Sequence, residues 1–167
     1  MLNDAVGSSV ADSYTTLAQY TDYAQAMGWH EQIVDHPAEA ALRRAAMAID
    51  RLYRAKGTRA NAAQALAWPR TGIVLDGQAV ASDTVPKAVR SAQCEMARLI
   101  LGGADPVAAT SEQRITKRRE KVDVLEEETE YEATGQAVSY PAVDSLLVGL
   151  IRPKGGHLPF SVPLTRV

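Results

Sequence analysis

Cysteine and aromatic side chains are scarce in this sequence. Cys94 is the single cysteine among 167 residues, which excludes an intramolecular disulfide and a cluster of thiolate metal ligands. In the stretch AQCEMA it is typical of a small residue within a helix rather than of a nucleophile. Aromatic residues make up only 5% of the chain, so an extended row of base-stacking side chains is not expected.

Long apolar runs and a secretory leader are also missing. No apolar run approaches the roughly 20 residues that a membrane-spanning helix requires. The first residues, MLNDAVGSSVADSY, have no basic start followed by an apolar block, which a signal peptide would have. We therefore expect no membrane partner and a protein that is cytosolic when it is made.

The overall charge has no strong sign. The chain has 18 Lys and Arg residues and 20 Asp and Glu residues, a formal net charge of -2, and so no global attraction for nucleic acid. Hydrophobic residues at 46% and charged residues at 23% are ordinary for a globular protein. A chain of this length forms about one domain and buries roughly two thirds of its unfolded surface.

Motifs that carry enzymatic chemistry are absent from the sequence. His30, His36 and His157 lack the spacing of paired helical metal ligands, and neither a G-x-S-x-G motif nor a phosphate-binding glycine loop is present. The triplet of residues 126 to 128 offers paired carboxylates, but neighbouring residues on a strand point to opposite faces, and a charge run is usually solvated. The sequence predicts a protein that is not an enzyme and binds no metal or cofactor.

Apolar periodicity and capping signals predict a mainly α fold. Thr16 and Gln19 form a capping-box pattern for a first helix that Gly28 closes. A second helix is expected from Pro37 to Gly57. Its apolar stripe comprises Leu42, Ala45, Ala46, Ile49, Leu52 and Tyr53, and its opposite face carries Arg43, Arg44, Asp50, Arg51 and Arg54.

Two further helices complete this prediction. A third helix is capped by Asp83 or Thr84, has Pro86 in its first turn and ends at Gly102-Gly103. Its apolar stripe is Val85, Ala88, Val89, Ala92, Met96 and Leu99. A short helix opens at Tyr140-Pro141 and docks on the core through Val143, Leu146, Leu147, Leu150 and Ile151.

The predicted fold is a small helical bundle with a short β-hairpin or strand element and an extended C-terminal tail. We divide the chain into a flexible N-terminus (residues 1 to 13), a helical domain (14 to 151) and the tail (152 to 167). The tail, RPKGGHLPFSVPLTRV, has three prolines and two glycines, which prevent a regular helix. Its apolar side chains alternate as in an extended peptide: Leu158, Phe160, Val162 and Leu164.

The segment QALAWPRTGIVLDG, residues 64 to 77, predicts a change of chain direction between the second and third helices. Pro69 ends a short helical turn, and Trp68 fills the space between the two helices. Asp76-Gly77 favours a tight hairpin between residues 73–75 and 78–80. We call this segment the elbow and expect Arg70 to face outward, toward a neighbouring molecule or DNA. Its defining residues are Gln64, Trp68, Pro69, Arg70, Asp76 and Gly77.

Residues 115 to 131, ITKRREKVDVLEEETEY, predict a strand, because Val122 and Val124 alternate with polar residues. Its first half is basic and its second half is acidic. The basic residues are Lys117, Arg118, Arg119 and Lys121, and the acidic ones include Glu126, Glu127, Glu128 and Glu130. A strand with this much charge buries at most one face.

Two stretches combine basic and aromatic residues, as single-stranded-DNA-binding proteins do. RLYRAK contributes Tyr53 among Arg51, Arg54 and Lys56, and WPR contributes Trp68 beside Arg70. A simpler interpretation places Tyr53 in the core and the arginines on the solvent face. We favour the simpler interpretation and keep a single-stranded-DNA-binding accessory protein as the alternative function.

In their order along the chain, these features resemble the head-tail adaptor (connector) proteins of tailed bacteriophages, some relatives of which are labelled DnaT-like single-stranded-DNA-binding proteins. The resemblance covers about residues 14 to 151 and depends on EAALRRAAMAIDRLY, QALAWPRTG, VPKAVRSAQCEMARLIL, EKVDV and YPAVDSLLVGLI. Its most specific parts are Gln64 with Trp68-Pro69-Arg70, and the closing YPAVDSLL. The tail departs from the family pattern in being unusually rich in proline and glycine.

The resemblance implies a structural protein of the virion neck. Such a protein forms a ring, twelve copies being expected, under the portal protein and above a stopper or tail-completion protein. DNA passes through its channel without sequence specificity, and the C-terminal segment grips the portal. Before assembly the protein would be in the host cytoplasm.

Two surfaces follow from this implied role. A ring of identical subunits uses heterologous contacts, so we expect the basic half of the charged strand in one subunit to approach the acidic half in its neighbour. In the tail, Leu158, Phe160, Val162 and Leu164 are the expected anchors on the portal, because an extended peptide can place alternate side chains in a partner's pockets. A solvated charged hairpin and a disordered terminus are the alternatives.

Overall fold

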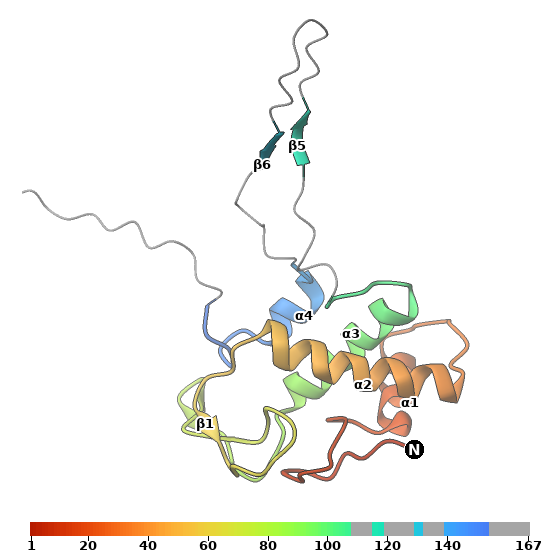
Figure 1. Ribbon diagram of the computed structural model, residues 1–167. Helices are drawn as coiled ribbons and strands as arrows, with labels where there is room; N and C mark the ends of the chain where they lie inside the picture. The colour runs from red at the N-terminus through yellow and green to blue at the C-terminus, as the bar shows by residue number, and fades with distance from the viewer. Residues whose placement is uncertain (108–114, 119–128, 132–138, 154–167) are drawn as a thin grey trace, which may run out of the picture.

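A bundle of four helices forms the body of the protein in the computed structural model (Figure 1). The structure describes residues 1–107, 115–118, 129–131 and 139–153. The helices are α1 (Leu17–Ala26), α2 (Asp35–Leu52), α3 (Lys87–Leu101) and α4 (Pro141–Leu146). Helix α3 contacts each of the other three, and α1 also contacts α2. The predicted mainly α fold is confirmed.

Helix α1 begins and ends as its sequence predicts. The backbone N–H of Gln19 donates to Thr16 Oγ1, and the backbone N–H of Thr16 donates to Gln19 Oε1, each at 3.1 Å. Gly28 has a φ of 68°, which suits a residue that ends a helix. The predicted capping box is therefore confirmed.

Helix α2 has different ends from those predicted. It ends at Leu52 rather than Gly57, because Tyr53 is extended and buried and Ala55 then forms a β-bridge with Ile151. Pro37 is the third helical residue, and the N-cap position is Val34, which makes no side-chain cap. Asp50 is half-buried, so its predicted place on the solvent face is wrong.

Helix α3 begins after Pro86 without a side-chain cap, so neither predicted capping residue acts as one. The hydroxyl of Thr84 instead donates to the carbonyl oxygen of Ala81 at 3.3 Å. Leu99 was placed in the apolar stripe but is 37% exposed, whereas Ile100 is buried. Gly102 ends the helix as predicted.

The hydrophobic core lies between α2 and α3 and is closed by α4. Val143, Leu147 and Leu150 are fully buried, so the predicted docking stripe of α4 is confirmed. Cys94 is buried within α3, and burial raises the pKa of its thiol to about 12. A thiol that stays protonated is a poor nucleophile, in agreement with a packing role.

Three antiparallel strand pairs accompany the helices. They are β1 (Thr58–Arg59) with β2 (Arg70–Thr71), β3 (Val74–Leu75) with β4 (Gln78–Ala79), and β5 (Ile115–Arg118) with β6 (Thr129–Tyr131). Asp76 and Gly77 have positive φ angles of 51° and 78°, as a two-residue hairpin requires, which confirms the predicted turn. The single strand predicted over residues 115 to 131 is wrong, because its two ends pair with each other.

The N-terminal residues lie against the helical body. Asp12 accepts hydrogen bonds from the backbone N–H of Asn3 and from Arg43 Nε, each at 2.7 Å. Ser13 and Tyr14 are buried. Composition alone does not reveal a partner such as Arg43, and the flexibility predicted for residues 1 to 13 stays a prediction.

Candidate functional site

The elbow is held in shape by Gln64. This side chain is 2% exposed, and its amide nitrogen donates to the carbonyl oxygens of Leu66 at 2.8 Å and Pro69 at 3.1 Å. Its amide oxygen accepts from the backbone N–H of Asn61 at 3.0 Å. Trp68 is 3% exposed, and the peptide bond to Pro69 is cis. Gln64 therefore links the backbone of residues 61, 66 and 69, and Trp68 lies in the core.

Arg70 is half-buried and is held by backbone carbonyl oxygens. Its guanidinium donates to the carbonyl oxygens of Lys56, of Gly57 at 2.8 Å and of Ala67 at 3.0 Å. Partial burial lowers the pKa of Arg70, and so does the positive charge of Arg59 and Arg152 nearby. Three backbone acceptors hold this side chain, and its predicted contact with a neighbouring molecule or DNA stays a prediction.

The elbow is also tied to α2 by a buried pair. The hydroxyl of Tyr14 donates to Asp50 Oδ1, and the backbone N–H of Ala67 donates to Asp50 Oδ2 at 2.8 Å. Burial raises the pKa of the Asp50 carboxyl and that of the Tyr14 hydroxyl. Sequence reasoning missed this pair, since Asp50 has the helical spacing of a solvent-facing residue.

Basic residues from three separate segments meet beside the elbow. Strand pairing places Arg59 opposite Arg70. The backbone N–H of Arg152 donates to the carbonyl oxygen of Arg54 at 2.7 Å, and that of Lys56 donates to Leu150 at 2.9 Å. We call this group the basic surface. It consists of Arg54, Lys56, Arg59, Arg70 and Arg152.

The basic surface has more positive than negative charge in the described ranges, although the Asp50 carboxylate interacts with Arg59 and Arg70. Arg54, Lys56, Arg59 and Arg152 are exposed, and none of them forms an ion pair with a described carboxylate. The arginines that do form ion pairs lie elsewhere: Arg43 with Asp12 and Glu39, Arg44 with Asp105, and Arg98 with Glu31. A chain with a net charge of -2 therefore has a local excess of positive charge here.

The aromatic residues near the basic surface cannot stack on nucleic-acid bases. Tyr53 is 4% exposed and Trp68 is 3% exposed, and both belong to the core. The interpretation that places Tyr53 in the core with Arg51 and Arg54 on the solvent face is confirmed. The two basic-aromatic stretches therefore do not form a stacking site.

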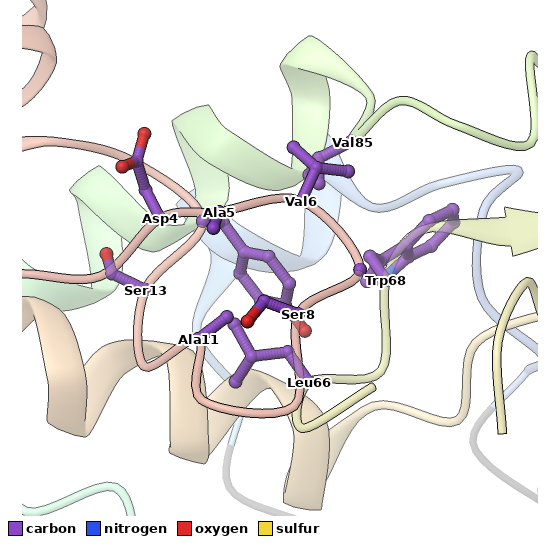
Figure 2. Close-up of a pocket in the computed structure, with 11 residues that line it drawn as sticks. Asp4, Ala5, Val6, Ser8, Ala11, Ser13, Leu66, Trp68 and Val85 are labelled. Carbon is purple, nitrogen blue, oxygen red and sulfur yellow. The ribbon is translucent and has the colours of Figure 1, made fainter. Parts of the chain in front are cut away.

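A small cavity lies between the N-terminal segment and the elbow (Figure 2). It is lined by Tyr14, Leu66, Trp68 and Val85 among others, and its volume is about 10 Å³. That volume holds about one water molecule. The cavity is too small for a substrate, and within the described residues no group of His, Cys, Asp and Glu side chains is placed to hold a metal ion.

The charged strand and the tail fall largely outside the described residues. In the β5–β6 pair, the backbone register sets Lys117 opposite Glu130 and Arg118 opposite Thr129 within one chain. The remaining predicted interface residues, Arg119, Lys121, Glu126, Glu127 and Glu128, lie outside the described ranges, as do Leu158, Phe160, Val162 and Leu164. The predicted contacts of these residues with other molecules stay predictions.

One protein family matches the chain along its whole length. The family model is described as "Putative DnaT-like ssDNA binding protein" and covers residues 1–167. No curated protein and no solved structure matches the chain significantly. In the part of the chain that the structure describes, no helix has both the length and the apolar character needed to cross a membrane.

Proposed function

The chain belongs to the DnaT-like ssDNA-binding family, and we propose that it serves as a non-enzymatic head-tail adaptor of a tailed phage. In this proposal the protein forms a ring of about twelve copies under the portal in the virion neck. DNA passes through the ring, and a stopper or tail-completion protein binds below it. The proposal starts from the order of motifs that resembles the adaptor family.

The observation that carries the proposal is the way in which the closing motif YPAVDSLL anchors the chain before the tail. Val143 of helix α4 is fully buried. Leu147 and Leu150, which follow the helix, are fully buried in the same core. The Ala55–Ile151 bridge and the hydrogen bond from Arg152 to Arg54 then fix the last residues before the tail. An anchored start supports the use of residues 154 to 167 as a docking peptide.

Ring formation requires that one face of each subunit meets a different face of the next. We propose that the basic residues Lys117, Arg118, Arg119 and Lys121 of one subunit approach Glu126, Glu127, Glu128 or Glu130 of its neighbour. The backbone register also sets Lys117 opposite Glu130 within one chain. Exposed ion pairs contribute about 0 to 1 kcal/mol each, so they would select the partner and register more than strengthen the ring.

Mass photometry of the purified chain tests the ring. The double substitution Arg118→Glu with Arg119→Glu should shift the oligomers toward monomers, because it places like charges at the proposed contact. The double substitution Arg44→Glu with Arg98→Glu is the matched control, since it changes the charge equally on the helical body. An identical oligomer distribution in the wild type and the first variant would contradict the charged interface.

Copurification with the portal tests the docking tail. Deletion of residues 153–167 should leave the helical body folded, because Leu150 is the last buried leucine among the described residues, and should abolish portal binding. Phe160→Ala should weaken portal binding by itself, since a bulky aromatic in a pocket is a frequent hot spot of an interface. Portal binding that survives the deletion would exclude the tail as the docking element.

A single-stranded-DNA-binding accessory protein is the second candidate, and the family description favours it. That role predicts a clear preference for single strands over duplexes and no binding to a portal. The burial of Tyr53 and Trp68 weighs against it, since strand preference commonly depends on exposed aromatic side chains. A competition experiment between single-stranded and duplex DNA separates the two roles.

A further inference from the structure

We propose that the basic surface binds the backbone phosphates of nucleic acid, single-stranded or duplex, without reading the bases. Arg54, Lys56, Arg59 and Arg152 are exposed, and none of them forms an ion pair with a carboxylate in the described part of the chain; the nearby carboxylate of Asp50, which interacts with Arg59 and Arg70, offsets only part of their charge. Arg59 and Arg152 both lie close enough to Arg70 to lower its pKa, in addition to the effect of its burial. Like charges gathered in this way repel one another, and an anionic partner relieves that repulsion.

The backbone that carries these side chains is held by many contacts. The Arg70 guanidinium donates hydrogen bonds to three backbone carbonyl oxygens around the elbow. Arg59 Nη1 donates to the carbonyl oxygen of Gln64 at 3.2 Å. Gly57 lies so close to β2 that a Cβ atom there would be 2.1 Å from the carbonyl oxygen of Thr71. The exposed cations therefore project from a fixed framework, which lowers the ordering cost of binding a ligand.

The composition of the surface favours a phosphate backbone over an acidic protein. A protein interface usually has an apolar core with aromatic or methionine side chains. The exposed large apolar residues of the described chain all lie outside residues 54–72 and 151–152; the nearest in sequence are Met47, Val74 and Val148. Phosphate contacts need only positive charge and hydrogen-bond donors, and arginine supplies both.

No exposed aromatic side chain lies in the segments that carry the basic surface, and this decides the mode of binding. Trp68 is the aromatic residue within these segments and Tyr53 directly precedes the first of them, and both are buried. Without stacking platforms, the surface has no means of gripping unpaired bases. It should bind single strands and duplexes alike, which departs from the single-strand binding in the family description.

This inference is independent of the ring. Phosphate binding is measured on the purified chain whether or not it assembles, so failure of the adaptor proposal leaves it standing. If the protein does form a ring, the basic surface is a candidate for the face that contacts the DNA.

Fluorescence anisotropy with labelled oligothymidine and with a labelled duplex of equal length tests the inference across a salt series. Both DNAs should bind, with a logarithm of affinity that falls linearly with the logarithm of salt concentration. The double substitution Arg54→Ala with Arg152→Ala should reduce the slope by roughly 0.9 per lost contact on duplex and roughly 0.7 on a single strand. The conservative pair Arg54→Lys with Arg152→Lys should keep the slope, because it keeps the charge.

The matched control is Arg44→Ala with Arg98→Ala, which removes the same charge from two arginines that already have carboxylate partners. It should leave the slope nearly unchanged, and circular dichroism checks that every variant is folded. An equal reduction of the salt slope in the two double-alanine variants would overturn the inference, and so would the absence of binding to either DNA. Binding of the single strand alone would also overturn it, as would binding of a DVLEEETEYE peptide without binding of DNA.

Discussion

The hydroxyl of Tyr53 donates a 2.6 Å hydrogen bond to Asp144 Oδ1, joining the end of α2 to α4 across 91 residues of sequence. Asp144 also accepts hydrogen bonds from the hydroxyl of Ser139 and the backbone N–H of Tyr140. Burial raises the pKa of Tyr53, as does its bond to Asp144, so the hydroxyl remains a donor at neutral pH. This contact fixes α4 in the place from which the tail departs.

Removing the Tyr53 hydroxyl should loosen α4. Tyr53→Phe should reduce the free energy of unfolding by about 1.5 to 3 kcal/mol, because a hydrogen bond to a charged group is lost inside a packed site. The control is Tyr140→Phe, whose hydroxyl forms no hydrogen bond with the described residues. Denaturant unfolding followed by circular dichroism measures both variants, and equal stability of the two would contradict a role for the Tyr53–Asp144 contact.

Gly57 should tolerate no side chain. Its φ of 65° is in the left-handed region, and an added Cβ would collide with the carbonyl oxygen of Thr71. Gly57→Ala should therefore cost more stability than the about 1 to 2 kcal/mol of the backbone conformation alone.

Gly72→Ala is the matched control for this effect, because Gly72 has a φ of 73° and open space around it. It should show only the conformational cost. If thermal unfolding gave the same midpoint for both alanine variants, the close approach of Gly57 to β2 would have no energetic importance.

Gln93 should hold the N-terminal segment on the body. This fully buried side chain accepts from the backbone N–H of Tyr14 at 3.0 Å and donates to Ser13 Oγ and the carbonyl oxygen of Leu42, each at 2.8 Å. Gln93→Leu leaves the Tyr14 N–H without an acceptor, at a cost of about 1 to 3 kcal/mol. Limited proteolysis should then cut within the first residues faster than in the wild type.

The exposed Gln25 of α1 provides the control for this substitution. Gln25→Leu should change the free energy of unfolding by less than about 0.5 kcal/mol and leave the cleavage rate unchanged. Unchanged cleavage in Gln93→Leu would mean that the N-terminal segment is held by its other contacts, such as that of Arg43 with Asp12.

Asp50 should give the protein an unusual dependence of stability on pH. Because burial raises its pKa in the folded state, the folded protein binds a proton more tightly than the unfolded chain does. As pH rises from the ordinary value of 3.8 through the raised pKa, this group therefore makes the fold less stable. Glu31 and Glu39 act in the opposite sense. Arg98 lowers the pKa of Glu31, and the N-terminal amine lowers the pKa of Glu39.

Comparison with Asp50→Asn isolates this contribution. The free energy of unfolding of the wild type minus that of the variant should decrease as pH rises above 3.8. Residue 50 has a carboxyl group that titrates there in the wild type only. Chemical denaturation at a series of pH values gives this difference. An increase with pH would show that the hydrogen bonds from Tyr14 and Ala67 outweigh the burial of the carboxylate.

Local signals in the sequence were sufficient for the parts of the fold whose partners are close in the chain. Thr16 and Gln19 are three residues apart and form the predicted capping box. Asp76 and Gly77 form the predicted turn by their own backbone preferences. The burial of Val143 and Leu147 follows from the helical spacing of apolar residues. In each of these places the information is contained in a few neighbouring residues.

Contacts between residues that are distant in sequence could not be predicted from such local signals. The predicted end of α2 is wrong because the backbone of Tyr53 is extended, and the hydroxyl of this residue reaches Asp144, which is 91 residues away in sequence. The hydrogen bonds of Arg70 could not be predicted from the sequence. Its acceptors are backbone carbonyl oxygens, and every residue has one. The basic surface combines residues 54–59, 70 and 152, and only the β1–β2 pairing and the Ala55–Ile151 bridge bring them together.

The docking of α4 on α3 turns the stretch between these helices into a closed loop. Loop-closure entropy grows only with the logarithm of length, so doubling such a loop costs about 0.6 kcal/mol. The two ends of this stretch, at Leu101 and Pro141, are held together by the packing of α4 on α3, so a change in its length costs the helical body little.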